Sequence, residues 1–166
     1  MTMNKCDLLG LFLYLFSIQV TESIEVCPDG FIKHHGSCYK FLHHHLSWPE
    51  SITFCKVIGA HLVTIETENE HNFLIQKIHE IEGSFDVKDF WIDLNDAADQ
   101  GTWMWSLTHT QATYLKWGGG NPNYFAREDC GGLFHGGQYF FGDFVCDRKQ
   151  HLICEINLNF GEAIIG

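Results

Sequence analysis

Residues 117–155 read WGGGNPNYFAREDCGGLFHGGQYFFGDFVCDRKQHLICE, and this stretch decides the fold. It opens with a glycine-rich loop around Asn121-Pro122-Asn123 that has no regular hydrophobic period. Two short segments follow, at 138–146 and 151–156, and their aromatic and aliphatic residues are typical of strands. Irregular loops usually carry function on a rigid scaffold. We therefore expect a binding site between residues 117 and 130.

The cysteines indicate a disulfide framework. One of the seven, Cys6, falls in an apolar leader, which leaves an even set of six. These six are Cys27, Cys38, Cys55, Cys130, Cys146 and Cys154. An even set in an exported chain is typical of disulfide bonding, and six cysteines allow fifteen connectivities. Their spacing alone does not choose among these connectivities.

Upstream of the loop, the sequence predicts two helices and then short strands. The capping-box spacing of Ser47 and Glu50 precedes a helical period over 49–59, and a second such spacing at Thr67 precedes a period that ends at Gly83. Short strands are expected at 27–31, 37–41, 90–94 and 102–106. Two helices followed by strands predict an α+β domain.

The first 23 residues have the layout of a secretory signal peptide. Lys5 supplies a positive charge, and Leu8 to Phe16 is almost entirely apolar. This run is too short for a membrane anchor, because spanning about 30 Å of hydrocarbon takes roughly 20 residues. We expect a signal peptide at 1–23, one domain at 24–156 and a short C-terminal tail at 157–166, in a protein that is secreted and extracellular.

The charge and the motifs exclude two classes of function. Without its first 23 residues the chain keeps nine Lys and Arg against nineteen Asp and Glu, a net charge of −10. An acidic exported chain is a poor binder of nucleic acid. The sequence also has no recognisable nucleophile–base motif and no glycine-rich loop that opens a helix, so we expect no enzymatic activity.

Eight short groups of residues, taken in order, resemble one known family. They are Cys27-Pro28, Cys38-Tyr39-Lys40-Phe41, the Cys55 helix leading to Gly59-Ala60-His61-Leu62-Val63, Trp91-Ile92-Asp93-Leu94, Trp103-Met104-Trp105-Ser106, Asn121-Pro122-Asn123, Glu128-Asp129-Cys130, and Asp143-Phe144-Val145-Cys146 before Ile153-Cys154-Glu155. This set resembles the C-type lectin domain, an extracellular module that often binds sugars through calcium. The resemblance implies a C-type lectin-like fold with two helices, short antiparallel sheets and a long ligand-binding loop. It also implies the disulfides Cys27–Cys38, Cys55–Cys154 and Cys130–Cys146.

In members of that family that bind sugar, one calcium ion at the tip of the long loop is held by side-chain oxygens that also bond two adjacent sugar hydroxyls. The resemblance places its ligands, which also bind the carbohydrate, at Asn121, Asn123, Glu128 and Asp143. Calcium takes six to eight oxygen ligands at about 2.3–2.6 Å. Asn121 stands where the family has Glu or Gln, and Gly142 offers no side-chain oxygen. The resemblance thus implies a single weak Ca²⁺ site that recognises glycans or glycoproteins.

The function stays open between two classes. Taken alone, Asn121-Pro122-Asn123 is a common turn sequence, and the same scaffold can serve as a calcium-independent protein-interaction module. The oxygen missing at Gly142 favours that module, whereas the retained oxygen ligands favour a secreted calcium-dependent lectin. A working site would have a cis bond before Pro122. Innate immunity, cell adhesion and a role in a body fluid fit a secreted lectin equally, and any homo-oligomer would be non-covalent.

Other candidate residues lie near the loop. The family's auxiliary calcium position keeps Asp96, but Gln100 and Tyr124 stand where it has acids, so we expect no second ion. Tyr124, Phe125 and His135 are candidates either for stacking on an apolar sugar face or for covering a disulfide.

Two further features are unusual. The run His43-His44-His45 invites a zinc or copper interpretation, but adjacent histidines on an exposed turn cannot all face one ion, so we expect a solvated loop. Asp93 places a carboxylate in a segment that should form a central strand, where the family has Gly, and the sequence offers no physical account of it.

Overall fold

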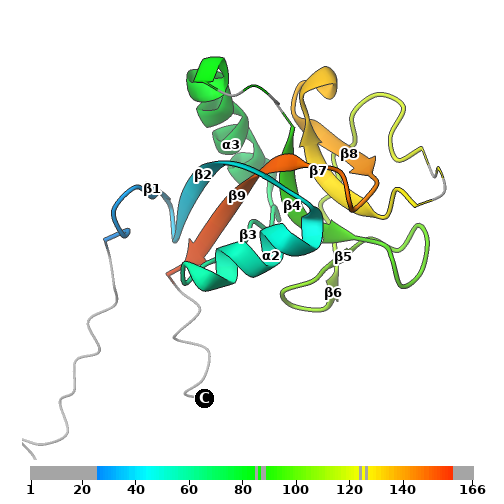
Figure 1. The fold of residues 1–166 in the computed structure, drawn as a ribbon, viewed down its shortest axis with the longest axis horizontal. Coiled ribbons are helices and arrows are strands. Elements are labelled where there is room, and N and C mark those ends of the chain that lie inside the picture. Colours follow the sequence, from blue (N-terminus) through cyan, green and yellow to red (C-terminus); the bar gives the residue numbers. More distant parts are fainter. Residues whose placement is uncertain (1–25, 85, 87–88, 124, 126, 159–166) are drawn as a thin grey trace, which may run out of the picture.

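The computed structural model describes residues 26–84, 86, 89–123, 125 and 127–158 (Figure 1). The predicted signal peptide at 1–23 and all but two residues of the predicted tail lie outside the described residues. Within these described ranges, no helix is long and apolar enough to cross a membrane.

Two helices form where the capping signals predict them. Helix α2, Trp48–Val57, follows Ser47, whose backbone N–H donates to the Glu50 carboxylate at 2.7 Å. Helix α3, Glu68–Ile81, begins after Thr67, whose hydroxyl oxygen accepts from the Glu70 N–H at 3.2 Å. The short 3₁₀ turn η1, Glu82–Ser84, ends α3. The helix predictions are therefore confirmed to within a few residues.

The described strands form one connected sheet in which β1, β2, β9, β4, β5 and β6 lie in that order. Strand β3 pairs with β9, and β7 pairs with both β4 and β8. The strands are β1 Ile32–His34, β2 Ser37–Leu46, β3 His61–Leu62, β4 Phe90–Asn95, β5 Met104–Trp105, β6 Thr110–Gln111, β7 Cys130–Phe134, β8 Phe140–Phe144 and β9 Gln150–Asn157. The α+β prediction is confirmed. The expected antiparallel pairing holds for the other described strand pairs, whereas β4 runs parallel to β9, so the sheet is mixed.

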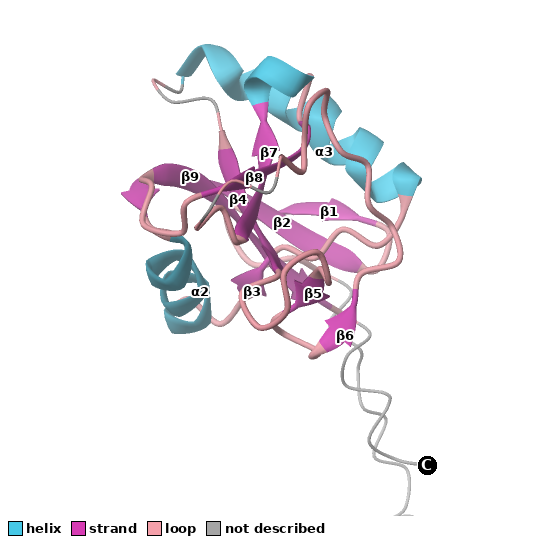
Figure 2. Cartoon of the chain, turned by 90° about the vertical axis from the view of Figure 1, so that its right-hand side faces the viewer, coloured by secondary structure: helices cyan, strands magenta, loops and turns pink. Residues whose placement is uncertain are grey.

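The core lies around β4, whose first five residues are all buried. Figure 2 shows this sheet running between α2 and α3. The three disulfides join Cys27 to Cys38, Cys55 to Cys154, and Cys130 to Cys146, as the resemblance implies. The second bridge ties α2 to β9, and the third ties the start of β7 to the segment that follows β8. The disulfides thus cross-link α2 and the two ends of the β7–β8 hairpin into the fold around one buried strand.

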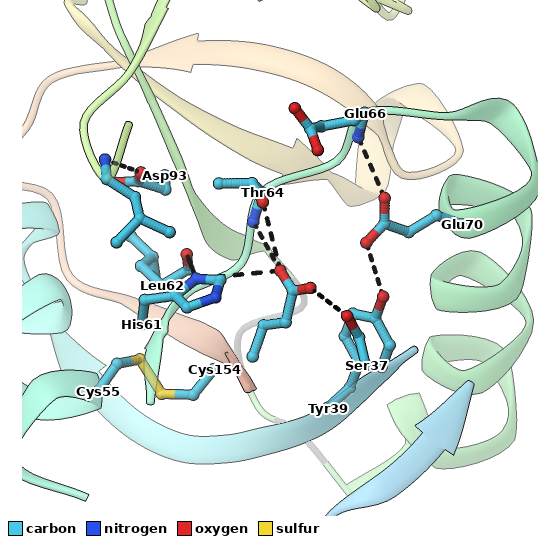
Figure 3. A network of polar contacts seen from close by, with 12 residues as sticks. Ser37, Tyr39, Cys55, His61, Leu62, Thr64, Glu66, Glu70, Asp93 and Cys154 are labelled. Carbon is cyan, nitrogen blue, oxygen red and sulfur yellow. Dashed lines mark hydrogen bonds and ion pairs between the residues drawn. A yellow bond between two sulfur atoms is a disulfide. The ribbon is translucent and has the colours of Figure 1, made fainter. Parts of the chain in front are cut away.

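A buried polar network fastens α3 to the sheet (Figure 3). The Ser37 hydroxyl donates to Glu155 Oε1 at 2.7 Å, and the Thr64 N–H donates to Glu155 Oε2 at 3.2 Å. The Tyr39 hydroxyl donates to Glu70 Oε1 on α3 at 2.7 Å. Burial raises the pKa of Glu155, and it raises the pKa of Glu70 to about 7.

The histidine run lies in β2 and not in a loop, which corrects the sequence-based expectation. The pairing of β2 with β9 changes register between Leu42 and Leu46, so His43, His44 and His45 occupy an irregular part of the strand. The three side chains are exposed at the surface, as expected.

Candidate functional site

The long loop is held in place by its contacts with β8. Trp117 forms an isolated parallel bridge with Phe141, and the Gly118 N–H donates to the Phe141 carbonyl at 2.8 Å. The Asn121 N–H then donates to the Gly118 carbonyl at 3.0 Å, which folds the chain back. Residues 121–123 are thereby brought beside the end of β8 that carries Asp143.

Three of the four predicted ligands meet at this point. The Asn121–Pro122 bond is cis, as expected for a working site. The Asn123 N–H donates to Asp143 Oδ2 at 2.9 Å, and the Asn123 amide nitrogen lies 3.5 Å from Asn121 Oδ1. Asp143 is only 3% exposed. One carboxylate and two amides therefore converge, and these are the oxygen ligands that calcium prefers.

The fourth predicted ligand, Glu128, makes no hydrogen bond to the other three in the described structure. Its backbone N–H donates to the Phe125 carbonyl at 3.1 Å, which places it in the last turn of the loop before Cys130. Its Oε2 atom is buried, and no donor among the described residues satisfies it. Leaving a carboxylate oxygen buried without a partner is costly. A cation would remove that cost, so this atom fits a calcium ligand.

The position of the absent fifth oxygen is closed by packing. A Cβ at Gly142 would lie 3.1 Å from the Phe134 Cβ and 3.1 Å from the Phe144 ring. Those contacts are tighter than ordinary van der Waals distances, so any side chain at this position must displace its neighbours. The side chains available to an ion here are therefore two carboxylates and two amides, without a fifth side-chain oxygen at position 142.

Three aspartates, Asp96, Asp129 and Asp143, form an acidic cluster that adds negative charge to the candidate site. Asp96 is 3% exposed, its Oδ2 accepts from the Gly101 N–H at 2.7 Å, and its Oδ1 is buried with no donor among the described residues. Burial raises the pKa of Asp96, and the charges of Asp129 and Asp143 raise it further. Asp129 was not predicted as a member of this acidic cluster, although its position between the predicted ligand Glu128 and the disulfide-bonded Cys130 indicates that it lies near the site.

Of the three aromatic candidates, the two that the structure describes lie at different places. Tyr124 lies outside the described residues. Phe125 is 67% exposed, and its N–H donates to Asn123 Oδ1 at 2.8 Å, so it stands directly at the candidate site. His135 lies in the η2 turn, His135–Gly137, at the far end of the β7–β8 hairpin, and its ring packs 5.5 Å from that of Tyr139. Of the described pair, Phe125 is the one placed to touch a ligand.

Comparison with known proteins identifies the family of this fold and loop. The family model described as Lectin C-type domain matches residues 44–156. The chain belongs to the C-type lectin domain family. This lectin domain is 37% identical over 129 residues to the human protein C-type lectin domain family 17, member A, and the match covers 78% of this chain but 32% of that protein. The first curated relative is therefore about three times as long as the region shared with it.

Two other similarities cover nearly the whole of the matched protein. The Perlucin-like protein of Mytilus galloprovincialis is 27% identical over 157 residues, which cover 89% of this lectin and 97% of that protein. The solved SPL-1–GlcNAc complex has a TM-score of 0.67 and 27% sequence identity, and the match covers 79% of this chain and 95% of that chain. These two matches thus cover most of this chain as well as nearly all of the proteins it is compared with.

Proposed function

We propose that this lectin domain binds carbohydrate through one calcium ion held by Asn121, Asn123, Glu128 and Asp143. The observation that carries the proposal is the convergence of Asn121, Asn123 and Asp143 at the tip of the anchored loop, joined by the Asn123–Asp143 hydrogen bond of 2.9 Å. The buried Glu128 Oε2 atom, which no donor among the described residues satisfies, gives independent support. The ligand class is supported by SPL-1, a relative whose solved complex contains GlcNAc.

The same side chains would ligate the ion and form hydrogen bonds with the sugar. Bound calcium supplies a hard cation to which two adjacent sugar hydroxyls can add as oxygen ligands. The carboxylates of Glu128 and Asp143 accept hydrogen bonds from those hydroxyls, and the amide nitrogens of Asn121 and Asn123 donate to their oxygens. The side-chain Oδ1 atom of Asn123 accepts a hydrogen bond from the Phe125 N–H with one of its two lone pairs. The other lone pair serves as the calcium ligand.

The site carries less charge than a site with Glu at position 121 would. Glu128 and Asp143 contribute a formal charge of about −2, and Asn121 contributes none. Ligand charge is one of the terms that set calcium affinity. We accordingly expect a modest affinity for calcium and weak binding of a single sugar.

We also propose that the protein is exported to the extracellular space. The support is the leader pattern at 1–23 together with three disulfides, because disulfides persist in oxidising compartments and are rare in the cytosol. Expression with residues 1–23 intact should give a protein in the medium that lacks this segment by mass spectrometry. Retention of the leader in the cell-associated protein would contradict export.

Calcium is expected to raise the thermal midpoint of the purified domain. Binding to the native state alone adds about 2.7 kcal/mol at a hundredfold excess of ion over Kd. Scans in EDTA and then in increasing CaCl₂ measure this shift. Glu128→Gln and Asp143→Asn should each weaken the calcium response at least tenfold, since each loses a charged ligand.

The variants also separate loss of the site from loss of the fold. Glu128→Gln should leave the calcium-free midpoint unchanged or raise it, because it removes the charge from a buried oxygen that has no donor within the described part of the chain. Asp29→Asn, at an exposed position in the N-terminal segment, is the matched control and should respond to calcium like the wild type. If calcium shifts no midpoint, the calcium-lectin proposal is wrong. The closed position at Gly142 would then favour a calcium-independent protein-interaction module.

Phe125→Ala is expected to weaken sugar binding without changing calcium binding. Aromatic contacts beyond simple burial contribute about 0.5–1.5 kcal/mol, which corresponds to roughly a 2- to 10-fold loss of affinity. Binding to immobilised glycans in calcium would be compared with Val57→Ala, which alters another exposed apolar side chain, on α2. Equal loss in both variants, or no loss in Phe125→Ala, would remove Phe125 from the binding face.

A further inference from the structure

A second group of metal-binding side chains lies at a different place in the fold. His45 Nε2 and His151 Nε2 lie 2.9 Å and 3.1 Å from the same oxygen, Asp86 Oδ1. The three ligand atoms all lie within 4.8 Å of one another. The two imidazole rings are 4.7 Å apart at 76°, so their nitrogen atoms approach the carboxylate from different directions.

The sheet brings these residues together from distant parts of the chain. His45 comes from β2, His151 from β9, and Asp86 from the segment between η1 and β4. Side chains alternate along a strand. His44 accordingly faces the other way and packs 4.6 Å from the Phe54 ring on α2, whereas His45 turns toward His151.

The cluster has the exposure pattern of a site that an ion can enter. The His151 side chain is 1% exposed, while those of His45 and Asp86 are 43% and 73% exposed. One ligand is thus fixed inside the protein and two face solvent. Burial lowers the pKa of His151, which favours the neutral imidazole that metal ions require.

We propose that His45, Asp86 and His151 bind one Zn²⁺ ion, with water in the fourth position. Zinc takes imidazole nitrogen and carboxylate oxygen at about 2.0–2.2 Å in tetrahedral geometry, which separates neighbouring ligand atoms by about 3.4 Å. The two distances to Asp86 Oδ1 therefore need to open by a few tenths of an ångström, and the two imidazole nitrogens, which lie within 4.8 Å of each other, need to settle at the same separation. Calcium does not suit the same group, because it prefers a full set of oxygen ligands.

This zinc site is separate from the proposed calcium site. His151 pairs with Phe90 at the start of β4, whereas Cys130, beside the calcium ligands, pairs with Asn95 at the end of β4. Five residues of strand separate the two positions, which is roughly 16 Å. Zinc binding would join Asp86 to β2 and β9 and leave the sugar-binding loop unchanged. The two sites can therefore be tested independently.

The test is a calorimetric titration with ZnCl₂ in calcium-free buffer. The protein is the natively purified domain without residues 1–23, treated with a chelator to remove bound metal. We expect one Zn²⁺ per chain. Changing an outer-shell partner of a metal ligand costs about 10- to 100-fold in affinity, so loss of a ligand should cost at least as much. His45→Ala and Asp86→Asn should each weaken binding at least tenfold. Both positions are exposed, so neither variant is expected to unfold the protein, and thermal scans would check this.

Three controls make the result decisive. His44→Ala removes an adjacent histidine on the opposite face of β2 and should keep wild-type zinc affinity. Glu128→Gln should also keep it, because that residue belongs to the calcium site. The double variant His34→Ala, His35→Ala tests a different histidine pair, whose two rings share Asn69 Oδ1 as a partner at 3.0 Å and 3.1 Å. Loss of zinc binding in that double variant, unchanged binding in both His45→Ala and Asp86→Asn, or no binding by the wild type would overturn the proposal.

Discussion

Replacing Cys55 and Cys154 together by alanine is expected to lower the free energy of unfolding by about 5 kcal/mol. The disulfide joins residues 99 positions apart, and the chain-entropy model gives about 4.7 kcal/mol for closing a loop of 100 residues. Both cysteines are fully buried in a cluster with Leu62, Trp91 and Leu152, so the change also removes packing atoms from α2 and β9. Lost cross-linking and lost packing act in the same direction.

Urea unfolding measures this loss, and thermal scans should show the midpoint falling by roughly 15 °C for a domain of this size. The matched control is the Cys27→Ala, Cys38→Ala pair, which removes a bridge of sequence separation 11. A loop of that length is assigned roughly 3 kcal/mol. Equal losses in the two double variants would contradict the loop-length argument, and a larger loss in the control would reverse it.

Local patterns predicted the helices of this fold well and its long-range pairings poorly. The capping residues Ser47 and Thr67 mark the starts of α2 and α3 because a cap is a contact between residues three positions apart. The parallel pairing of Phe90 with His151 joins the middle of the domain to its last strand, and no local period encodes it. The disulfide connectivity likewise came from the family resemblance and not from spacing.

The candidate site divides in the same way. Asn121 and Asn123 are neighbours in sequence, and their approach to Asp143 follows once the loop is anchored at Phe141. The contribution of Asp96 could not be judged from sequence, because it depends on how closely Asp129 and Asp143 approach it in the folded chain. The zinc cluster depends even more on long-range pairing, since His45 and His151 become neighbours only when β2 and β9 pair.

Asp93, the carboxylate without an explanation in the sequence, is expected to make the domain less stable as pH rises. Asp93 is 2% exposed, and its Oδ2 accepts from the Leu107 N–H at 2.7 Å, which holds the turn after β5 (Figure 3). Burial raises the pKa of Asp93 from 3.8 to about 7, although hydrogen bonds oppose this. The native state therefore binds a proton more tightly than the unfolded state, and stability is lost between about pH 4 and pH 7.

Asp93→Asn should remove this dependence. A pKa difference of about three units between the native and unfolded states corresponds to at most about 4 kcal/mol in the free energy of unfolding. The amide oxygen of Asn can still accept the hydrogen bond from the Leu107 N–H. We expect the variant to match the wild type near pH 4 and to be more stable by up to that amount at pH 8, measured by urea unfolding across the range. The raised pKa values of Glu70 and Glu155 give both proteins a residual slope of the same sign, so the difference between them isolates Asp93. A variant that is no more stable than the wild type at pH 8 would show that Asp93 is held as a stabilising anion, and that the Leu107 contact outweighs the cost of burying its charge.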